Sequence, residues 1–432
     1  MSENAPKNDR KSGGRAARRG PLRAGAVAAG ALLALPAAGA AADTAGGTGF
    51  RFEVPEPTGG SAVGVAELHF VDESRDQWEA DGPRAFMASV WYPADPDAAT
   101  EPAGYMPQRV GELFAESQGI TEEIDWEGSR VSAGLGAPAD PDAGGLPVVL
   151  YSPGGGSPRG LGTTLAEDLA SHGYVVVAMD HTGEAPVRFP DGRVDEPRMD
   201  TGDPELLTRL MTERVADARF VLDRLEDARD GRPAPEGAAL PPGVADLLDL
   251  SEVGMFGHSM GGSAAAHTMH QDGRVDAGAD LDGSIAFSVE GGGFEEAFPV
   301  ADEGLDRPFL LVGGSRQAEE PGAGPVPNTH LTFEDWGRFW DNSTGWKRDV
   351  NFPEARHFSF TDAQALVPQF QEEFGLTDEE AARSIGTAED PARLHATQRA
   401  FVAAFFDRHL KGEPRPILDG PTPDHPDVRF IE

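Results

Sequence analysis

The stretch from residue 252 to residue 267 constrains this chain most, because it reads EVGMFGHSMGGSAAAH. Its apolar beginning suits a buried strand, and its alanines suit a helix that packs closely on a sheet. Ser259 lies at the sharp turn between the two, where flanking glycines remove Cβ clashes. We therefore predict that Ser259 is a catalytic nucleophile. The alternative is a glycine-rich turn whose serine only caps the helix.

A second apolar run also leads into glycines. Residues 146–152 (LPVVLYS) predict a buried strand that is followed by Pro153 and three glycines. A helix predicted over 161–172 and a strand over 174–180 complete a β-α-β unit, so part of the sheet is expected to be parallel. Glycines at the carboxyl end of a parallel strand let backbone N–H groups face a ligand, as an oxyanion hole requires. Alone, the segment is equally consistent with a flexible turn.

The remaining apolar patterns predict a sheet covered by helices. We expect an α/β fold, with a mostly parallel central sheet flanked by helices, in one domain with loop insertions over residues 61–411. The acidic interval 101–145 is interpreted as a surface excursion, apart from a short helix over 110–118. Further strands are expected at 63–71, 85–92, 275–281 and 308–313, and amphipathic helices at 204–228 and 395–411.

Residues 1–42 have the layout of a secretory signal peptide. A basic stretch is followed by a weakly apolar one and then by small residues that suit cleavage. Arg18 and Arg19 resemble a twin-arginine signal, so we predict a secreted, extracellular protein. The alternative is a retained anchor, although alanine and glycine make this stretch a poor membrane span. Residues 43–60 and 412–432 are expected to be a flexible segment and a C-terminal tail.

The composition narrows the chemistry and the partners. Cysteine is absent, which excludes disulfides, thiolate metal sites and a cysteine nucleophile. The formal net charge of -37 disfavours nucleic acid and anionic membranes as partners. Because salt screens the repulsion within so acidic a chain, we expect stability to rise from low to molar NaCl in thermal unfolding; an unchanged melting temperature would contradict this.

A serine hydroxyl becomes a good nucleophile only when an imidazole accepts its proton, and the imidazole in turn needs a carboxylate. Both partners are expected downstream of Ser259, at strand ends. His357 follows a strand-like stretch and opens a loop, which is the position required. His330 is the fallback among the 11 histidines.

Three acids compete for the carboxylate. Asp282 ends the strand that follows the nucleophile helix, and Glu319 follows the next strand, so both satisfy the required order. Asp280 would share a strand face with Asp282 but lie deeper in the sheet, where a charge needs its own partner. Position alone leaves Asp282 and Glu319 open.

Several motifs occur together in this chain: Val90-Trp91-Tyr92-Pro93, Leu150 to Gly156, Leu169 to Tyr174, Gly257 to Gly262, Leu281-Asp282-Gly283 and His357 to Asp362. Together they resemble the α/β-hydrolases related to secreted platelet-activating factor acetylhydrolase. The resemblance covers most of the chain after the signal and implies that the acid is Asp282. It also implies that the N–H groups of Gly155 and Met260 form the oxyanion hole. The chain differs from the pattern in Pro153, where histidine is common, and in its long 314–345 loop.

The mechanism implied is hydrolysis of a short-chain ester, a lipid or another small ester, through an acyl-enzyme, with no cofactor and no metal. The alternative hypotheses are a broad-specificity lipase or polyester hydrolase, an acyltransferase with the same triad, and a non-catalytic binding protein. No oligomeric state and no stable membrane insertion are implied. Some loop aromatics are expected to line an acyl pocket, with an ordinary core role as the alternative: Phe287, Phe294, Phe298, Trp336, Phe339 and Trp340.

Overall fold

Strands β5 (Leu146–Ser152) and β9 (Leu248–His258) lie side by side and parallel in the middle of the main sheet. The structure, a computed structural model, describes residues 1, 49–78, 80–199, 205–234, 237, 239–287, 293–316 and 324–432. The expected signal peptide, apart from Met1, lies outside these residues.

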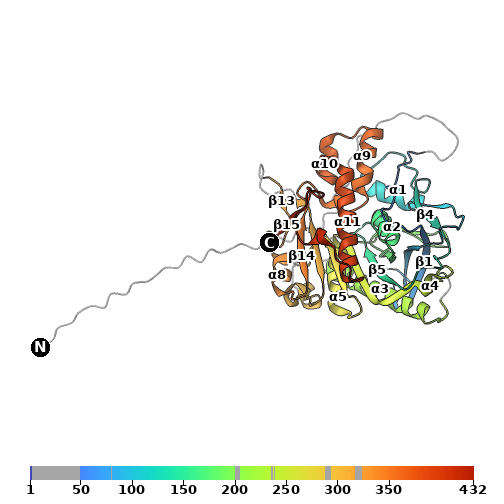
Figure 1. The fold of residues 1–432 in the computed structure, drawn as a ribbon, viewed down its shortest axis with the longest axis horizontal. Coiled ribbons are helices and arrows are strands. Elements are labelled where there is room, and N and C mark those ends of the chain that lie inside the picture. The colour runs from blue at the N-terminus through green and yellow to red at the C-terminus, as the bar shows by residue number, and fades with distance from the viewer. Residues whose placement is uncertain are drawn as a thin grey trace.

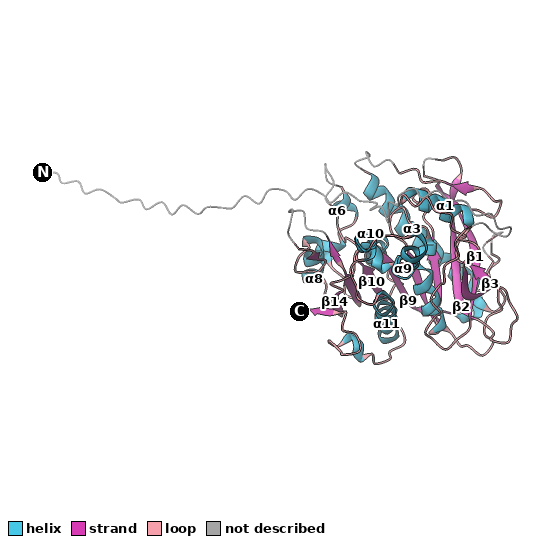
Figure 2. Ribbon diagram, turned by 90° about the horizontal axis from the view of Figure 1, so that it is seen from above, coloured by secondary structure: helices cyan, strands magenta, loops and turns pink. Residues whose placement is uncertain are grey.

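The main sheet holds 11 strands in the described part of the chain. Its other members are β1 (Val63–Asp76), β2 (Pro83–Pro93), β3 (Pro102–Gly104), β4 (Arg130–Leu135), β6 (Val175–Met179), β10 (Ala277–Leu281), β11 (Phe309–Gly313), β14 (Lys347–Asn351) and β15 (Arg429–Ile431). Their order is β15-β14-β11-β10-β9-β5-β6-β2-β1-β4-β3, and Figure 2 shows them from β14 on one side to β1 and β3 on the other. Neighbours from β14 to β6 are parallel, whereas β15 and β2 pair antiparallel at the ends of this block. The predicted mostly parallel α/β fold is confirmed.

Helices lie on both faces of this sheet (Figure 1). The longer ones are α1 (Gln108–Ser117), α2 (Thr163–Ser171), α3 (Leu206–Arg229), α5 (Met260–Gln271), α8 (Glu334–Asn342), α9 (Ala363–Phe374), α10 (Asp378–Ile385) and α11 (Pro391–His409). The short ones are α4 (Val244–Leu247), α6 (Phe294–Ala297), α7 (Val300–Glu303) and the 3₁₀-helices η1 (Arg159–Gly162), η2 (His357–Phe360) and η3 (Pro416–Leu418). Two small hairpins pair β7 (Val187–Arg188) with β8 (Val194–Asp195), and β12 (Ser315–Arg316) with β13 (Val326–Pro327).

Strand β5 shows how one sequence run serves two hydrophobic cores. Val149 and Tyr151 belong to the core that contains side chains of α2, α9 and α11. Val148 and Leu150 belong to the core on the other face, with side chains of α3 and α5. Since successive side chains of a strand point to opposite faces, a strand buried on both sides is apolar throughout. This explains why β5 reads as a continuous apolar run rather than an alternating one.

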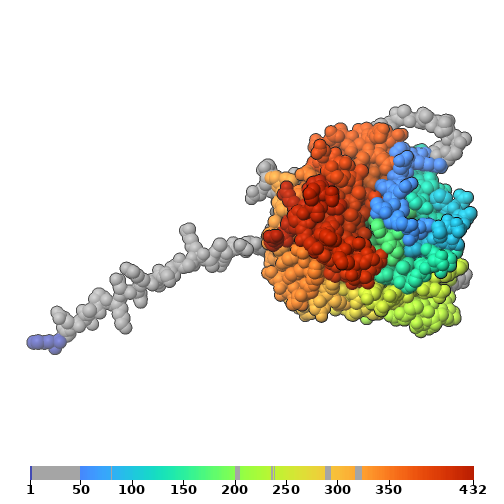
Figure 3. Space-filling view, in the orientation of Figure 1, coloured from blue at the N-terminus to red at the C-terminus, as the bar shows by residue number. Residues whose placement is uncertain are grey.

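The segment before the first strand does not behave as the sequence suggested. The expectation of a flexible segment over 43–60 is wrong for its described part, 49–60. Phe52 is 3% exposed and packs against Tyr105 and Trp126, with ring centroids 5.0 and 5.5 Å away. The backbone N–H of Glu53 donates to Gln369 in α9 at 2.8 Å. Figure 3 shows this blue part of the chain lying against the orange and red C-terminal part. Apolar contacts to distant helices, invisible in the local composition, hold it in place.

Two other expectations need correction. The interval 101–145 is not only a surface excursion, because β4 pairs with β1 and β3 with β4, which extends the sheet. The tail from residue 412 is not without structure either. Leu418 is 0% exposed, and β15 pairs with β14 as the edge strand. In the part of the chain described, no helix has both the length and the apolar character needed to cross a membrane.

Candidate active site

The nucleophile elbow lies between β9 and α5. Ser259 has φ 55° and ψ -122°, a left-handed backbone conformation that is strained for a residue with a side chain. The turn also brings backbones together without room for side chains. A Cβ atom on Gly261 would lie 1.8 Å from the carbonyl oxygen of Ser152, and one on Gly257 would lie 2.3 Å from the carbonyl carbon of Gly261. The glycines on both sides of Ser259 are therefore required by the packing of α5 against the end of β5.

The fold brings together the three residues named from the sequence. Nε2 of His357 lies 2.9 Å from Oγ of Ser259, and Nδ1 of His357 lies 2.7 Å from Oδ2 of Asp282. His357 opens η2 after β14, and Asp282 follows β10 directly. Since an ionised carboxylate can only accept, Nδ1 carries the proton, which leaves the Nε2 lone pair to accept the serine proton. This arrangement can take a proton from the hydroxyl of Ser259.

Asp282 is held as a carboxylate. It is 1% exposed, and its Oδ1 accepts hydrogen bonds from the N–H of Gly314 at 2.9 Å and from Nδ2 of Asn328 at 3.0 Å. Burial alone would raise its pKa, but the contact with His357, the charge of Arg316 and the Asn328 hydrogen bond together lower the pKa below its usual value. The carboxylate therefore stays charged at neutral pH. Sequence reasoning missed Asn328, because it lies in a stretch expected to be a loop.

The side chains of Ser259 and His357 are partly exposed to solvent, whereas the carboxylate of Asp282 is buried. Ser259 is half-buried, and the side chain of His357 is 36% exposed. The side chain of Asp282 is 1% exposed. A substrate can thus approach the serine, and the dry surroundings of the carboxylate strengthen its interaction with the imidazole.

His258 is a further residue of the site that the sequence analysis did not predict. Its Nε2–H donates to the backbone carbonyl oxygen of His357 at 2.8 Å, and the two rings lie 4.5 Å apart. Burial and the neighbouring His357 lower the pKa of His258 to about 3, so it stays neutral and keeps this hydrogen bond at ordinary pH. Its position directly before the nucleophile was the signal that could have found it.

The structure describes both backbone groups expected in the oxyanion hole. Gly155 lies in the turn after β5, and Met260 is the first residue of α5. Within the described part of the chain, neither N–H donates to a protein acceptor. An oxyanion hole needs donors that are left unpaired by the protein itself. Met260 directly follows Ser259, and Gly155 follows β5, the strand that pairs with β9. Their role remains a prediction.

The competing residues have other partners. Asp280 is 0% exposed, accepts a hydrogen bond from the N–H of Gly283 at 2.8 Å, and has a pKa that burial raises well above its usual value. Burial therefore favours the protonated form of Asp280 in the sheet. His330 lies 2.7 Å from Asp349 through Nδ1 and stacks on Trp340, so it does not contact Ser259. Glu319 lies outside the described residues.

The prediction that loop aromatics line an acyl pocket is wrong for most of these residues. Phe294 and Trp336 are 0% exposed. Both belong to the hydrophobic core, and so do Phe298 and Phe339. The ordinary core role therefore applies to these four residues. Phe287 is half-buried and packs edge-on against Phe294, and Trp340 stacks on His330 with ring centroids 4.1 Å apart.

A cleft of about 400 Å³ is lined by residues other than these aromatics. Its lining includes Trp91, Tyr105, Met106, Pro158 and Arg159.

The elbow and the Ser259–His357–Asp282 contacts on a mostly parallel sheet define a serine hydrolase of the α/β-hydrolase fold. A family model, platelet-activating factor acetylhydrolase, isoform II, matches residues 52–188. The chain is an α/β-hydrolase that resembles this family over about a third of its length, and it is a carboxylic ester hydrolase.

Similar proteins are named as esterases. The "probable 1-alkyl-2-acetylglycerophosphocholine esterase" of Arthroderma benhamiae is 26% identical over 406 residues, which are 88% of this chain and 94% of that protein. Platelet-activating factor acetylhydrolase of Bos taurus is 26% identical over 190 residues, 39% of this chain and 40% of its own length. The solved structure of a ferulic acid esterase from Streptomyces cinnamoneus is 37% identical, with a TM-score of 0.68, over 88% of this chain and 99% of that one.

Proposed function

We propose that Ser259, His357 and Asp282 are the catalytic residues of this esterase. The observation that carries the proposal is the continuous line of contacts from Ser259 Oγ through His357 to the buried Asp282 carboxylate. Oγ attacks the ester carbonyl carbon as Nε2 of His357 takes its proton, and the C–O bond to the alcohol breaks as His357 returns that proton to the leaving oxygen. Water, deprotonated by the same imidazole, then hydrolyses the acyl-serine.

The negative charge on the carbonyl oxygen needs stabilisation in both steps. We assign this role to the N–H groups of Gly155 and Met260, since neither donates to an acceptor in the described part of the chain. Met260 directly follows Ser259, and Gly155 follows β5, the strand that pairs with β9. Asp282 remains ionised and supports the imidazolium, which agrees with its lowered pKa.

The decisive test of the site is covalent labelling. A fluorophosphonate probe, followed by peptide mass analysis, is expected to label Ser259 in the wild type and not in Ser259→Ala. Labelling of Asp282→Asn should be slower than wild type, and labelling of Glu319→Gln should match wild type. A wild type that is folded but resists the probe would contradict the proposed function.

For the substrate, we propose short acyl esters of lipids or small alcohols. The support is the family and the names of the relatives from Arthroderma benhamiae and Bos taurus. Rates on p-nitrophenyl esters are expected to fall steeply as the acyl chain lengthens beyond a few carbons. A flat or rising profile would favour a broad lipase or a polyester hydrolase. Transfer of the acyl group to an added alcohol, measured by product analysis, would identify an acyltransferase.

A second candidate is the hydrolysis of feruloyl esters. It is favoured by the 37% identity to the ferulic acid esterase over 88% of this chain. Comparison of kcat/KM for methyl ferulate and p-nitrophenyl acetate separates the candidates, since a preference for methyl ferulate would assign an aromatic acyl group.

We also propose export, which rests on the N-terminal sequence alone. Residues 1–42 fused to a reporter enzyme are expected to send it to the culture medium, and Arg18→Lys with Arg19→Lys is expected to block this if the twin-arginine route is used. Retention of the unaltered fusion in the cell would contradict export.

A further inference from the structure

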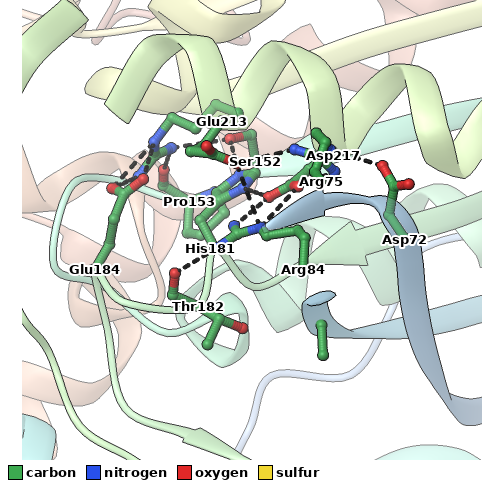
Figure 4. Close-up of polar contacts among 12 residues, drawn as sticks. Asp72, Arg75, Arg84, Ser152, Pro153, His181, Thr182, Glu184, Glu213 and Asp217 are labelled. Carbon is green, nitrogen blue, oxygen red and sulfur yellow. Dashed lines mark hydrogen bonds and ion pairs between the residues drawn. The ribbon is translucent and has the colours of Figure 1, made fainter. Parts of the chain in front are cut away.

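A buried polar cluster contacts the turn that follows β5. Figure 4 labels four of its members, Ser152, His181, Glu184 and Asp217, together with Pro153 of the turn. We call Ser152, His181, Glu184, Arg214 and Asp217 the loop-anchor cluster. Its members come from the end of β5, from the chain after β6 and from α3. None is more than 2% exposed. The reaction proposed above uses none of them.

Arg214 is the centre of this cluster because it holds the backbone of the turn. Its NH1 donates to the carbonyl oxygen of Pro153 at 2.6 Å and to Oγ of Ser152 at 2.9 Å. Its NH2 donates to the carbonyl oxygen of Gly154 at 3.3 Å. Glu184 pairs with the same guanidinium at 2.6 Å and keeps it oriented toward these carbonyls.

Ser152, His181 and Asp217 repeat the residue types of the catalytic site but form a support. Oγ of Ser152 lies 2.9 Å from Nε2 of His181, and Nδ1 of His181 lies 3.0 Å from Asp217. No substrate can reach a serine that is 0% exposed. Burial is the main cause that lowers the pKa of His181, followed by the charge of Arg214, so the imidazole is neutral and its Nε2 accepts from Ser152.

The far side of the cluster is tied to the sheet. Burial alone would raise the pKa of Asp217, but Arg84 and His181 hold it below its usual value, so Asp217 stays charged. Arg84 pairs with Asp217 at 2.5 Å and donates to the carbonyl oxygen of Thr182 at 2.7 Å. Arg75 also pairs with Asp217, at 2.8 Å. Arg214 is thus anchored to β1 and β2 through this chain of contacts.

Peptide geometry links Arg214 to the oxyanion hole. The carbonyl oxygen of Gly154 and the N–H of Gly155 belong to one planar trans peptide unit, so they point in opposite directions. The oxygen of Gly154 is held by Arg214 and by the N–H of Ser157, at 3.1 Å. The N–H of Gly155 must therefore point away from Arg214, and it has no acceptor in the described part of the chain.

We propose that Arg214 is a positioning residue that fixes the direction of the Gly155 N–H, and that Glu184 holds Arg214 for this purpose. The inference rests on the proposed function, because it gives the Gly155 N–H its role. Three consecutive glycines make the turn conformationally free, whereas stabilisation of an oxyanion requires donors that are already oriented. Fixing two carbonyl oxygens restricts two successive peptide planes. An apolar pair of the same volume would fill the space but could not do this.

The main test is the double variant Arg214→Gln with Glu184→Gln, which removes both buried charges together. Loss of an entire oxyanion donor costs about 10²- to 10³-fold in kcat, so a donor that is kept but loosened should cost about 10- to 100-fold. KM should change less than twofold. Affinity for a boronic acid that mimics the tetrahedral intermediate should fall in parallel with kcat. A merely structural role would lower the melting temperature without this selective loss.

Two further variants keep the test decisive. Arg214→Lys retains the pairing with Glu184 but offers one ammonium in place of a planar fork, so kcat should fall by about 3- to 10-fold at near wild-type stability. Arg399→Gln is the matched control, since Arg399 is also buried and donates to a backbone carbonyl, that of Glu56 at 2.9 Å, but does not touch the turn. It should keep wild-type kcat.

The outcomes separate this inference from the proposed function. If folded Arg214→Lys and the double variant keep kcat and boronic acid affinity within twofold of wild type, the inference is wrong although the esterase site stands. If wild type hydrolyses no ester and resists the fluorophosphonate, the proposed function fails first.

Discussion

His258 donates its Nε2–H to the backbone carbonyl oxygen of His357 at 2.8 Å, so the residue before the nucleophile holds the main chain of the proposed base. The two residues are 99 positions apart in the chain. Their contact ties η2 to the nucleophile elbow. Because the line of contacts needs Nε2 of His357 within hydrogen-bond reach of Ser259, a shift of η2 would break it.

We expect His258→Ala to lower kcat by about 10-fold, since a misplaced catalytic group costs one to two orders of magnitude. KM should stay nearly constant. Steady-state kinetics on p-nitrophenyl acetate measure the change. His267→Gln is the control, because His267 is also buried and donates to a carbonyl, that of Ile285, away from His357. Equal losses in both variants would contradict a specific role for His258.

Replacement of Asp280 in β10 and of Asp282 directly after β10 should affect kcat differently. Asp282→Asn is expected to lower kcat by about 10³- to 10⁴-fold, because an amide would favour the wrong tautomer of His357. Asp280→Asn should stay within about fivefold of wild type, since burial favours the uncharged form of Asp280 and an amide oxygen can still accept from Gly283. Kinetics and thermal unfolding of both variants check this. A larger loss in Asp280→Asn would reverse the assignment of the acid.

The segment before β1 should contribute to stability. Phe52→Ala is expected to reduce the free energy of unfolding by about 3 to 5 kcal/mol, because Phe52 is 3% exposed between aromatic rings. Leu135→Ala should cost less than about 0.5 kcal/mol, because Leu135 is 58% exposed. Urea unfolding measures both. A neutral Phe52→Ala would mean that the segment is not held as the structure describes.

Buried histidines should make the fold sensitive to acid. Burial lowers the pKa of His258, His267 and His395 to about 3. In the unfolded chain their pKa is about 6.5, so between these values the unfolded state binds more protons than the folded state. The stability is fully present above pH 6.5 or so and is lost as the pH falls toward 3. Each histidine contributes a slope of about 1.4 kcal/mol per pH unit in this window.

The difference between wild type and His267→Gln isolates one such group. The free energy of unfolding, measured in urea at several pH values from 6.5 to 4.5, should fall less steeply in the variant, by about 1 kcal/mol per pH unit. The comparison with the variant is needed because other groups oppose the effect of the histidines. Burial raises the pKa of Asp362 and Glu167 to about 7, so the stability that these two groups contribute increases as the pH falls. Equal slopes in both proteins would show that His267 is protonated in the fold.

Sequence reasoning reached furthest where the cause of a structure is local. The elbow at Ser259 follows from adjacent glycines that must pack against β5, and the strands follow from short apolar runs. His357 was predicted because it follows a strand and opens a loop. The order of strands left Asp282 and Glu319 open, and only the family resemblance favoured Asp282. The prediction of an aromatic pocket was wrong for most of its residues, because apolarity alone does not distinguish Trp336 in the core from a residue that lines a pocket.

What the sequence by itself determined was the α/β architecture, Ser259 as the proposed nucleophile and a short set of candidate partners for it. Only the tertiary structure decided which histidine and which acid meet the serine, that Asn328 and His258 hold them, and that Arg214 lies under the glycine turn. It also decided that residues 49–60 and the segment from residue 412 pack onto the domain. The reason is physical: turns and apolar runs depend on neighbours in sequence, whereas these contacts join segments far apart in the chain and exist only once the sheet has placed them together.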